Sequence, residues 1–373
     1  GGADRLQVAI MIADHASGDV LASVGSAAFR ADQRAGFVDM TRALRSPGST
    51  LKPLIYALAF DEGLAHPETL FEDRPLAFGR YAPQNFDRQF RGSVRAREAL
   101  QMSLNIPVVA LAASLGPERL MAALRRAGVE AVVPGGRPGL AVSLGGVGVT
   151  LSDLVQLYAA LARGGEVRPL RIDTHASVPA AQAARLVSQA AAWQVADILA
   201  GITPPQGLAG GAIAFKTGTS YGHRDAWALG FDGRHVAGVW MGRPDGASVP
   251  GAFGGDLAAP VLFRAFARIG QARAPLPPAP QALAVAANTP LSPPLQRFRP
   301  RGGILLPDPD APEVAFPPDG AELALEDDGP LMLRVRGGVP PFTWLADGQP
   351  LGVGLRAREI LVAPPRRTGA MAL

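Results

Sequence analysis

Several features are missing from this chain, and each absence excludes a class of protein. The 373 residues contain no cysteine, so disulfide bridges and cysteine-ligated metal sites are excluded. No apolar run reaches the roughly 18 residues that a membrane-spanning helix needs. The five histidines lack the spacing of metal ligands, and we expect neither a metal nor a cofactor. The net charge of +4 comes from arginines interleaved with acids, which argues against nucleic-acid binding.

Lysine is almost absent as well. Of the 36 lysines and arginines, only Lys52 and Lys216 are lysine. Arginine stays protonated at any working pH, whereas a buried lysine can lose its proton and act as a base. Each lysine lies in a short polar motif, Ser-Thr-Leu-Lys over residues 49–52 and Lys-Thr-Gly-Thr over residues 216–219. This distribution indicates that proton transfer is part of the chemistry.

The order of the predicted elements indicates an α+β fold. Residues 6–24 read as a strand hairpin, and residues 227–241 as a second hairpin turning at Asp232-Gly233. We expect the early and late strands to share one antiparallel sheet with flanking helices and an inserted helical lobe. Helices are predicted over residues 49–60, 150–163, 180–200 and 258–269.

Composition divides the chain into three regions. Residues 1–273 carry the sheet and the helical lobe, and residues 274–295 are rich in proline and alanine, which is typical of a semi-rigid linker. Residues 296–373 alternate short apolar runs with turns such as Asp347-Gly348, which predicts a small β-rich, sandwich-like module. The sequence leaves open whether this module is complete.

The spacing of Ser49 and Lys52 suggests a nucleophile and its base. Side chains three residues apart share one face of a helix. Pro53 is tolerated only in a first helical turn, so the helix should begin at or near Ser49. A serine hydroxyl is a weak nucleophile until a base removes its proton, and Lys52 can do this if burial and nearby positive charge lower its pKa.

A second polar pair, Ser103 and Asn105, lies between the two lysines in the sequence. Both residues precede Pro107 in what we predict to be a loop, from which their side chains would point into a cleft. There they would relay a proton and hold a substrate amide.

The third motif begins at Lys216 on a predicted strand. We expect Thr217 and Thr219 to hydrogen-bond a substrate carboxylate, with Lys216 supplying positive charge. Gly218 would leave room for a substrate backbone to pair with the strand edge. The backbone N–H groups of Ser49 and Thr219 would form an oxyanion hole.

The three motifs together resemble a known family. Residues 46–53, 99–107 and 215–220 are similar, in this order, to the three motifs of the transpeptidase domain of class A penicillin-binding proteins. The resemblance covers roughly residues 6–373, but the membrane helix and glycosyltransferase domain of that class have no counterpart here. The sequence leaves open whether that half was removed or is naturally absent.

The resemblance implies a penicillin-binding, serine β-lactamase-like transpeptidase fold and a peptidoglycan D,D-transpeptidase. Ser49 would attack a stem peptide ending in D-Ala-D-Ala, release terminal D-Ala and form an acyl-enzyme, which an amine of a neighbouring stem resolves into a cross-link. β-Lactams would acylate Ser49 as substrate mimics. The implied location is the bacterial periplasm, with an inner-membrane anchor in a segment outside this chain.

Alternative functions stay open. A D,D-carboxypeptidase differs only in its acceptor, and a penicillin-binding sensor or scaffold would show little turnover. A β-lactamase needs a deacylating base, and the surroundings of Glu130 and Glu166 do not resemble one. Residues 296–373 would bind a cell-wall protein or the wall, or act as a spacer. The acceptor amine and the oligomeric state are not predicted.

One glycine-rich segment is a weaker candidate. Residues 145–148 read Gly-Gly-Val-Gly but lack the following lysine of a phosphate-binding loop. The segment precedes Thr150 and Asp153, whose spacing is typical of a helix cap. We therefore predict a turn.

Overall fold

The structure is a computed structural model, and it describes residues 6–29, 35–172, 184–208, 213–269, 273–283, 291–306, 311–318, 320–321, 329–346 and 349–362. By its internal contacts the chain forms two compact units, Gly1–Ile304 and Leu305–Leu373. Residues 296–304 lie in the first unit, where the Phe298 ring stacks on that of Phe71 with centroids 4.7 Å apart. The bounds predicted for the linker, residues 274–295, and for the start of the module, residue 296, stay predictions.

A five-stranded antiparallel sheet forms the centre of the first unit. Its strand order is β2-β1-β10-β9-β8, so β8 is an edge strand. β1 pairs with β10 from Gln7 opposite Gly242 to Asp14 opposite His235. The prediction that strands from both ends of this region share one sheet is therefore confirmed. The strands are β1 (Gln7–Asp14), β2 (Val20–Val24), β8 (Ala214–Thr219), β9 (Asp225–Phe231) and β10 (His235–Gly242).

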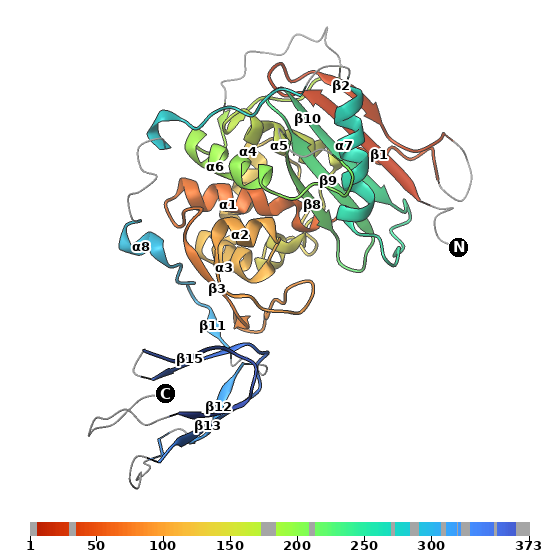
Figure 1. The fold of residues 1–373 in the computed structure, drawn as a ribbon. Helices are drawn as coiled ribbons and strands as arrows, with labels where there is room; N and C mark the ends of the chain where they lie inside the picture. The colour runs from red at the N-terminus through yellow and green to blue at the C-terminus, as the bar shows by residue number, and fades with distance from the viewer. Residues whose placement is uncertain are drawn as a thin grey trace. The chain divides into compact units, whose positions relative to one another are not determined.

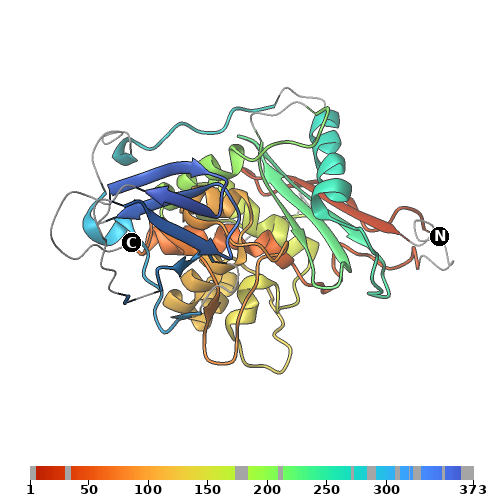
Figure 2. The ribbon, with the colours of Figure 1, turned by 60° about the horizontal axis from the view of Figure 1, so that its bottom comes forward.

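The sheet separates two hydrophobic cores, because alternate side chains of a strand point to opposite faces. In β1, Ala9 and Met11 join the large core, whereas Val8 and Ile10 pack on the smaller one. Helix α7 (Ala259–Arg268) covers the smaller core, and the other helices lie across the sheet from it (Figures 1 and 2). The predicted layering of an antiparallel sheet between helices is confirmed.

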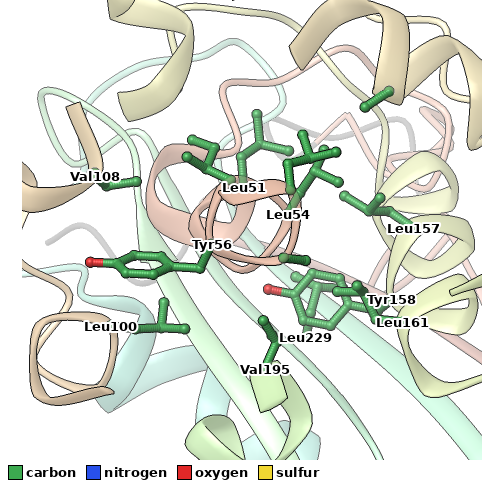
Figure 3. Close-up of a cluster of buried hydrophobic side chains, with 14 of the residues drawn as sticks. Leu51, Leu54, Tyr56, Leu100, Val108, Leu157, Tyr158, Leu161, Val195 and Leu229 are labelled. Carbon is green, nitrogen blue, oxygen red and sulfur yellow. The ribbon is translucent and has the colours of Figure 1, made fainter. Parts of the chain in front are cut away.

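Helix α1 (Lys52–Asp61) lies inside the helical lobe, and all of its residues except Asp61 are buried. Figure 3 shows it surrounded by apolar side chains from several elements, among them Leu100, Leu157 and Val195. A helix that is apolar on every side is typical of the core of a large domain. Lys52, the charged residue at a buried position of α1, therefore lies in a dry environment.

The lobe around α1 contains the remaining helices and two-stranded sheets of the first unit. The helices α2 to α6 are Ala96–Gln101, Asn105–Leu115, Pro117–Arg126, Leu151–Ala162 and Gln189–Ala200. The strands β3 to β7 are Leu70–Asp73, Leu76–Ala77, Gly92–Arg95, Glu166–Val167 and Ala184–Arg185. Single turns are η2 (Gly48–Leu51), η3 (Leu140–Leu144), η4 (Gly254–Ala258), η5 (Gln281–Leu283) and α8 (Pro293–Gln296), and β11 (Ile304–Leu305) lies at the boundary of the units.

The predicted helices agree with the structure in type and differ at their ends. The predicted helix 150–163 is α5, and Thr150 and Asp153 form its reciprocal cap with N···O distances of 3.0 and 2.9 Å. The helix predicted over 180–200 begins only at Gln189, because the Ser188 hydroxyl caps it and β7 precedes it. Residues 180–183 of that prediction lie outside the described residues.

The second unit contains two small antiparallel sheets. One consists of β12 (Glu313–Phe316), β13 (Leu331–Arg336) and β16 (Glu359–Val362), and the other of β14 (Phe342–Ala346) and β15 (Gln349–Leu355). Leu333 and Trp344, one from each sheet, belong to a single core. The β-rich module is confirmed, while the predicted turn at Asp347-Gly348 lies outside the described residues.

Among the described residues no single helix is long and apolar enough to cross a membrane; only α3 and α4 taken together pass that test, with an 87° bend between them.

Candidate active site

Ser49 lies in the short 3₁₀ turn η2, which continues directly into α1 at Lys52. The predicted α-helix over residues 49–60 is therefore corrected at its start. Pro53 occupies the first turn of α1, as expected for a residue without an N–H group. Ser49 is partly exposed, and its hydroxyl has no hydrogen-bond partner among the described residues. The nucleophile candidate is thus open to a substrate.

Three glycines allow the Ser49 turn to pack directly on neighbouring backbone. Gly48 has a φ of +52°, and a Cβ there would lie 2.5 Å from the carbonyl oxygen of Thr219 on β8. A Cβ on Gly218 would lie 2.8 Å from the carbonyl oxygen of Pro47, and one on Gly145 would lie 2.5 Å from the nitrogen of Gly48. Gly218 therefore makes room for the nucleophile turn, not for a substrate backbone as the sequence suggested.

Lys52 points from α1 towards the second motif. Its side chain is fully buried. Its ammonium nitrogen lies 2.7 Å from Asn105 Oδ1, 3.0 Å from the Leu104 carbonyl oxygen and 3.3 Å from Ser103 Oγ, and it also donates to the Ser103 carbonyl. In the described structure no hydrogen bond joins it to Ser49 Oγ.

Lys216 reaches the same hydroxyl from the opposite wall. Its side chain is 2% exposed, and its nitrogen lies 2.9 Å from Ser103 Oγ and 2.9 Å from the Thr217 carbonyl oxygen. The two lysines are far apart in the sequence, yet both contact Ser103 Oγ. One hydroxyl therefore connects the only two lysine side chains in the chain.

Burial changes the proton affinity of both lysines. It lowers the pKa of Lys52 well below the ordinary value of 10.5, the charge of Lys216 lowers it further, and Asp73 opposes the shift. Burial also lowers the pKa of Lys216 to about 7. Both amines therefore lose their protons more readily than a lysine in water does.

The second motif only partly follows its predicted geometry. Ser103 lies in a turn with a φ of +59°, in the left-handed region that residues with a Cβ seldom adopt. Asn105 is not in a loop, because it is the first residue of α3 and Pro107 lies in the first turn of that helix. The strained turn at Ser103 directs the hydroxyl and the Asn105 amide towards Lys52, and such strain is typical of functional sites.

Two residues that no sequence motif identified support Asn105. The backbone nitrogen of Asn105 donates to Asn85 Oδ1 at 2.8 Å, and Asn85 Nδ2 lies 2.9 and 2.8 Å from the two carboxylate oxygens of Asp73. Asp73 lies on the inward face of β3, two residues after buried Phe71. In the sequence, the signal for Asp73 is an acidic residue at a strand position whose side chain should face the core, because such a carboxylate needs buried partners.

The third motif lies on the edge strand β8. Lys216 and Gly218 are buried, while Thr217 and Thr219 are partly exposed. The Thr219 hydroxyl accepts a hydrogen bond from the Gly254 nitrogen at 3.1 Å. Within the described chain no further strand pairs with the outer edge of β8. That edge can accept an extended peptide.

Three aromatic rings connect the loops that carry these motifs. Phe86, next to Asn85, lies 5.7 Å from both His223 and Phe253 between ring centroids, and His223 lies 4.9 Å from Phe253. Phe253 precedes the glycine that contacts Thr219. The rings therefore join the loop of the helical lobe to the turns beyond β8.

The two acids weighed as deacylating bases are placed differently. Glu166 lies on β6, and its carboxylate pairs with Arg168 at 3.1 Å, while Glu130 is exposed. In the part of the chain that the structure describes, no group of three or more acidic, histidine or cysteine side chains is arranged to hold a metal ion.

Comparison with known proteins gives consistent matches. Residues 8–236 match the family model for the penicillin-binding protein transpeptidase domain, and residues 304–373 match that of the penicillin-binding protein C-terminus family. The chain is 43% identical over 265 residues to penicillin-binding protein 1C of Escherichia coli (strain K12), covering 69% of this chain and 34% of that protein. Residues 225–227 and 238–246 are the segments that resemble penicillin-binding protein 1C in particular. The identity to penicillin-binding protein 1B of Vibrio cholerae is 34%, covering 64% of this chain and 33% of that protein.

Solved structures show the same fold. The PonA1 protein from Mycobacterium tuberculosis in complex with penicillin V matches with a TM-score of 0.62 at 22% identity, covering 75% of this chain and 83% of that one. Penicillin-binding protein 1A from Haemophilus influenzae matches with a TM-score of 0.61 at 20% identity, covering 74% of this chain and 49% of that one. The chain spans about a third of the length of the curated relatives it matches.

The packing of the Ser49 turn can be tested with a pair of glycine variants. Gly48 and Gly63 both have positive φ, +52° and +66°, but only at Gly48 would an added methyl group meet backbone atoms within 4 Å. Gly63→Ala should cost about 1 kcal/mol from the backbone conformation alone. Gly48→Ala should cost about 1–3 kcal/mol more from overpacking. Thermal unfolding measures both, and equal losses would contradict the close contact with Thr219.

Proposed function

Because the chain belongs to the penicillin-binding protein transpeptidase family, we propose that it is a D,D-transpeptidase that cross-links peptidoglycan stem peptides. The proposed reaction passes through an acyl-enzyme on Ser49 after loss of terminal D-Ala. The observation that carries the proposal is the shared Ser103 hydroxyl, which lies 3.3 Å from Lys52 Nζ and 2.9 Å from Lys216 Nζ. Lys52 itself follows the partly exposed Ser49 by three residues.

In the proposed acylation step, Ser49 Oγ attacks the penultimate D-Ala carbonyl while neutral Lys52 takes its proton. The contact between Lys52 and Ser49 would tighten on substrate binding, as catalytic hydrogen bonds often do. The Ser103 hydroxyl would pass a proton to the leaving nitrogen, and Lys52 would replace that proton. The C–N bond breaks, an ester forms on Ser49, and D-Ala leaves as an amine. The proton that Ser49 loses thus replaces the one given to the leaving nitrogen, and the proposed step needs no cofactor.

The remaining site residues would bind the substrate. Lys216, Thr217 and Thr219 would hold the terminal carboxylate, and the outer edge of β8 would pair with the peptide. The N–H groups of Ser49 and Thr219 would stabilise the oxyanion, an interaction whose loss costs about 3 kcal/mol in related sites. Asn105 would hold both Lys52 and the substrate amide.

β-Lactams would acylate Ser49 as mimics of D-Ala-D-Ala. We place the reaction in the bacterial periplasm, where the peptidoglycan substrate is found, with an inner-membrane anchor supplied by a segment outside this chain. For the C-terminal residues 296–373 we propose binding to a cell-wall protein. The match of residues 304–373 to a penicillin-binding protein C-terminal family supports a role linked to the same process.

The nucleophile can be tested with a fluorescent penicillin. We expect the unmodified chain to be labelled covalently and Ser49→Ala to lose all labelling, because the variant lacks the oxygen that forms the ester. Ser17→Ala, in the turn between β1 and β2, serves as the matched control and should label normally. Persistent labelling of Ser49→Ala would refute the assignment.

Lys52→Arg tests the base. Arginine keeps the positive charge but cannot release its proton, so acylation should slow by about 10²–10⁴-fold, the range typical of general-base catalysis. Lys216→Arg should retain more activity, because Lys216 is proposed to act mainly through its charge. The second-order acylation rate measures both variants, and a normal rate in Lys52→Arg would exclude the base role.

Product analysis distinguishes transpeptidase from carboxypeptidase and β-lactamase. We expect mass spectrometry to show a cross-linked product when the chain is given a D-Ala-D-Ala stem peptide and an acceptor amine. A hydrolysed peptide in place of the cross-link would favour a D,D-carboxypeptidase, and rapid hydrolysis of penicillin would favour a β-lactamase. A penicillin adduct without peptide turnover would favour the sensor or scaffold alternative.

A further inference from the structure

A buried carboxylate lies behind the second motif. Asp73 is fully buried at the end of β3, and its oxygens accept hydrogen bonds from Asn85 Nδ2 at 2.9 and 2.8 Å and from the Arg91 nitrogen at 2.8 Å. All of these contacts are donated to the carboxylate, which is the pattern of an ionised group. Among the described residues no arginine or lysine forms an ion pair with it. The charge of Arg91 acts on Asp73 without a direct ion pair, and a buried charge that lacks such a pair is costly, so its persistence requires a reason.

Asn85 links Asp73 to Asn105 through hydrogen bonds to both residues. The carboxylate fixes the orientation of the Asn85 amide, because only the NH₂ group can donate to it. Asn85 Oδ1 then accepts a hydrogen bond from the backbone nitrogen of Asn105, at 2.8 Å. The second donor of Asn85 Nδ2 goes to the Gln89 carbonyl oxygen at 2.8 Å, which ties the same pair to the loop after β4.

The Asn105 side chain is oriented in the same way. Its Nδ2 donates to the Gln84 carbonyl oxygen at 2.7 Å, which leaves Oδ1 to accept from Lys52 at 2.7 Å. A continuous set of hydrogen bonds therefore runs from Asp73 through Asn85 and Asn105 to Lys52. The negative charge at one end lies opposite the amine at the other.

We propose that Asp73 and Asn85 are a positioning pair for the acylation step, which holds Asn105 against Lys52 and balances the proton on Lys52 with a buried negative charge. This inference deepens the proposed function and rests on it. Asp73 touches neither substrate nor nucleophile, and acts only through Asn85 and Asn105. It explains why a charge is kept in the core of the helical lobe.

The electrostatics agree with this geometry. Asp73 raises the pKa of Lys52 against the larger effects of burial and of Lys216 on β8, which lower it. Burial raises the pKa of Asp73 itself, whereas the hydrogen bonds from Asn85 and the Arg91 nitrogen lower it. The charge of Arg91 also lowers this pKa, and that of Asp87 raises it. Burial raises the pKa of the Tyr56 hydroxyl on α1, and the charge of Asp73 raises it further, so that this hydroxyl stays neutral. The amine of Lys216 and the carboxylate of Asp73, both buried, thus act on the pKa of Lys52 in opposite directions.

The scarcity of lysine makes a direct test possible. Because Lys52 and Lys216 are the only lysines, ¹³C-lysine labelling of the full chain gives two side-chain signals whose titration NMR can follow without any substrate. Lys52→Arg assigns them. Removing the charge by Asp73→Asn should lower the titration midpoint of Lys52 by about one pH unit, as expected for charges several ångströms apart.

A swap variant separates charge from structure. Asp73→Asn combined with Asn85→Asp keeps an amide–carboxylate pair but moves the charge one hydrogen bond closer to Lys52. The Lys52 midpoint should then rise above that of the unmodified chain, and the acylation rate at high pH should recover relative to Asp73→Asn alone. The swap also provides a folded comparison if the single variant fails to fold. Asp245→Asn, at a carboxylate outside this set of hydrogen bonds, is the charge control and should shift nothing.

An unchanged Lys52 midpoint in both Asp73→Asn and the swap variant would overturn the proposal, whatever happens to thermal stability. A loss of stability with no shift would likewise assign the pair a purely structural role. Failure of the proposed function appears elsewhere, as an unmodified chain that penicillin does not label while its Lys52 midpoint still responds to Asp73.

Discussion

The central constraint on this structure is the removal of two lysine side chains from water around one serine hydroxyl. Taking an ammonium group out of water costs several kcal/mol unless its protons find acceptors or leave. Lys52 and Lys216 are both buried, and both contact Ser103 Oγ. The rest of the lobe satisfies this requirement. It supplies carbonyl and amide acceptors, it strains the Ser103 turn to aim them, and it holds a buried carboxylate behind Asn105.

The three motifs come together because the nucleophile turn is packed tightly between sheet and lobe. Helix α1 is buried along its length, so the turn that precedes it has little freedom. Glycines at 48, 145 and 218 remove the side chains that would keep the backbones apart. A site assembled by backbone packing is positioned more rigidly than one carried by free loops. That rigidity suits a reaction in which Ser49, Lys52 and the substrate carbonyl must be aligned.

The edge position of β8 gives the same strand two roles. Its inner face carries Lys216 and Gly218, which build the site, and its outer edge is available to an extended peptide. Gly218 was expected to make room for the substrate, but the space it leaves is filled by Pro47 and Thr50.

The sequence by itself determined the fold class, the order of the main strands and helices, and the residues of the three motifs. These are local or compositional signals: strand alternation, helix caps, and two lysines kept within polar motifs. Only the tertiary structure decided that α1 starts at Lys52, that Asn105 opens a helix, and that Asp73 and Asn85 belong to the site. Hydrogen bonds through Asn85 in the loop after β4 and Asn105 on α3 link Asp73 on β3 to Lys52. Such contacts depend on packing between distant segments, and no periodicity or spacing within one segment encodes them.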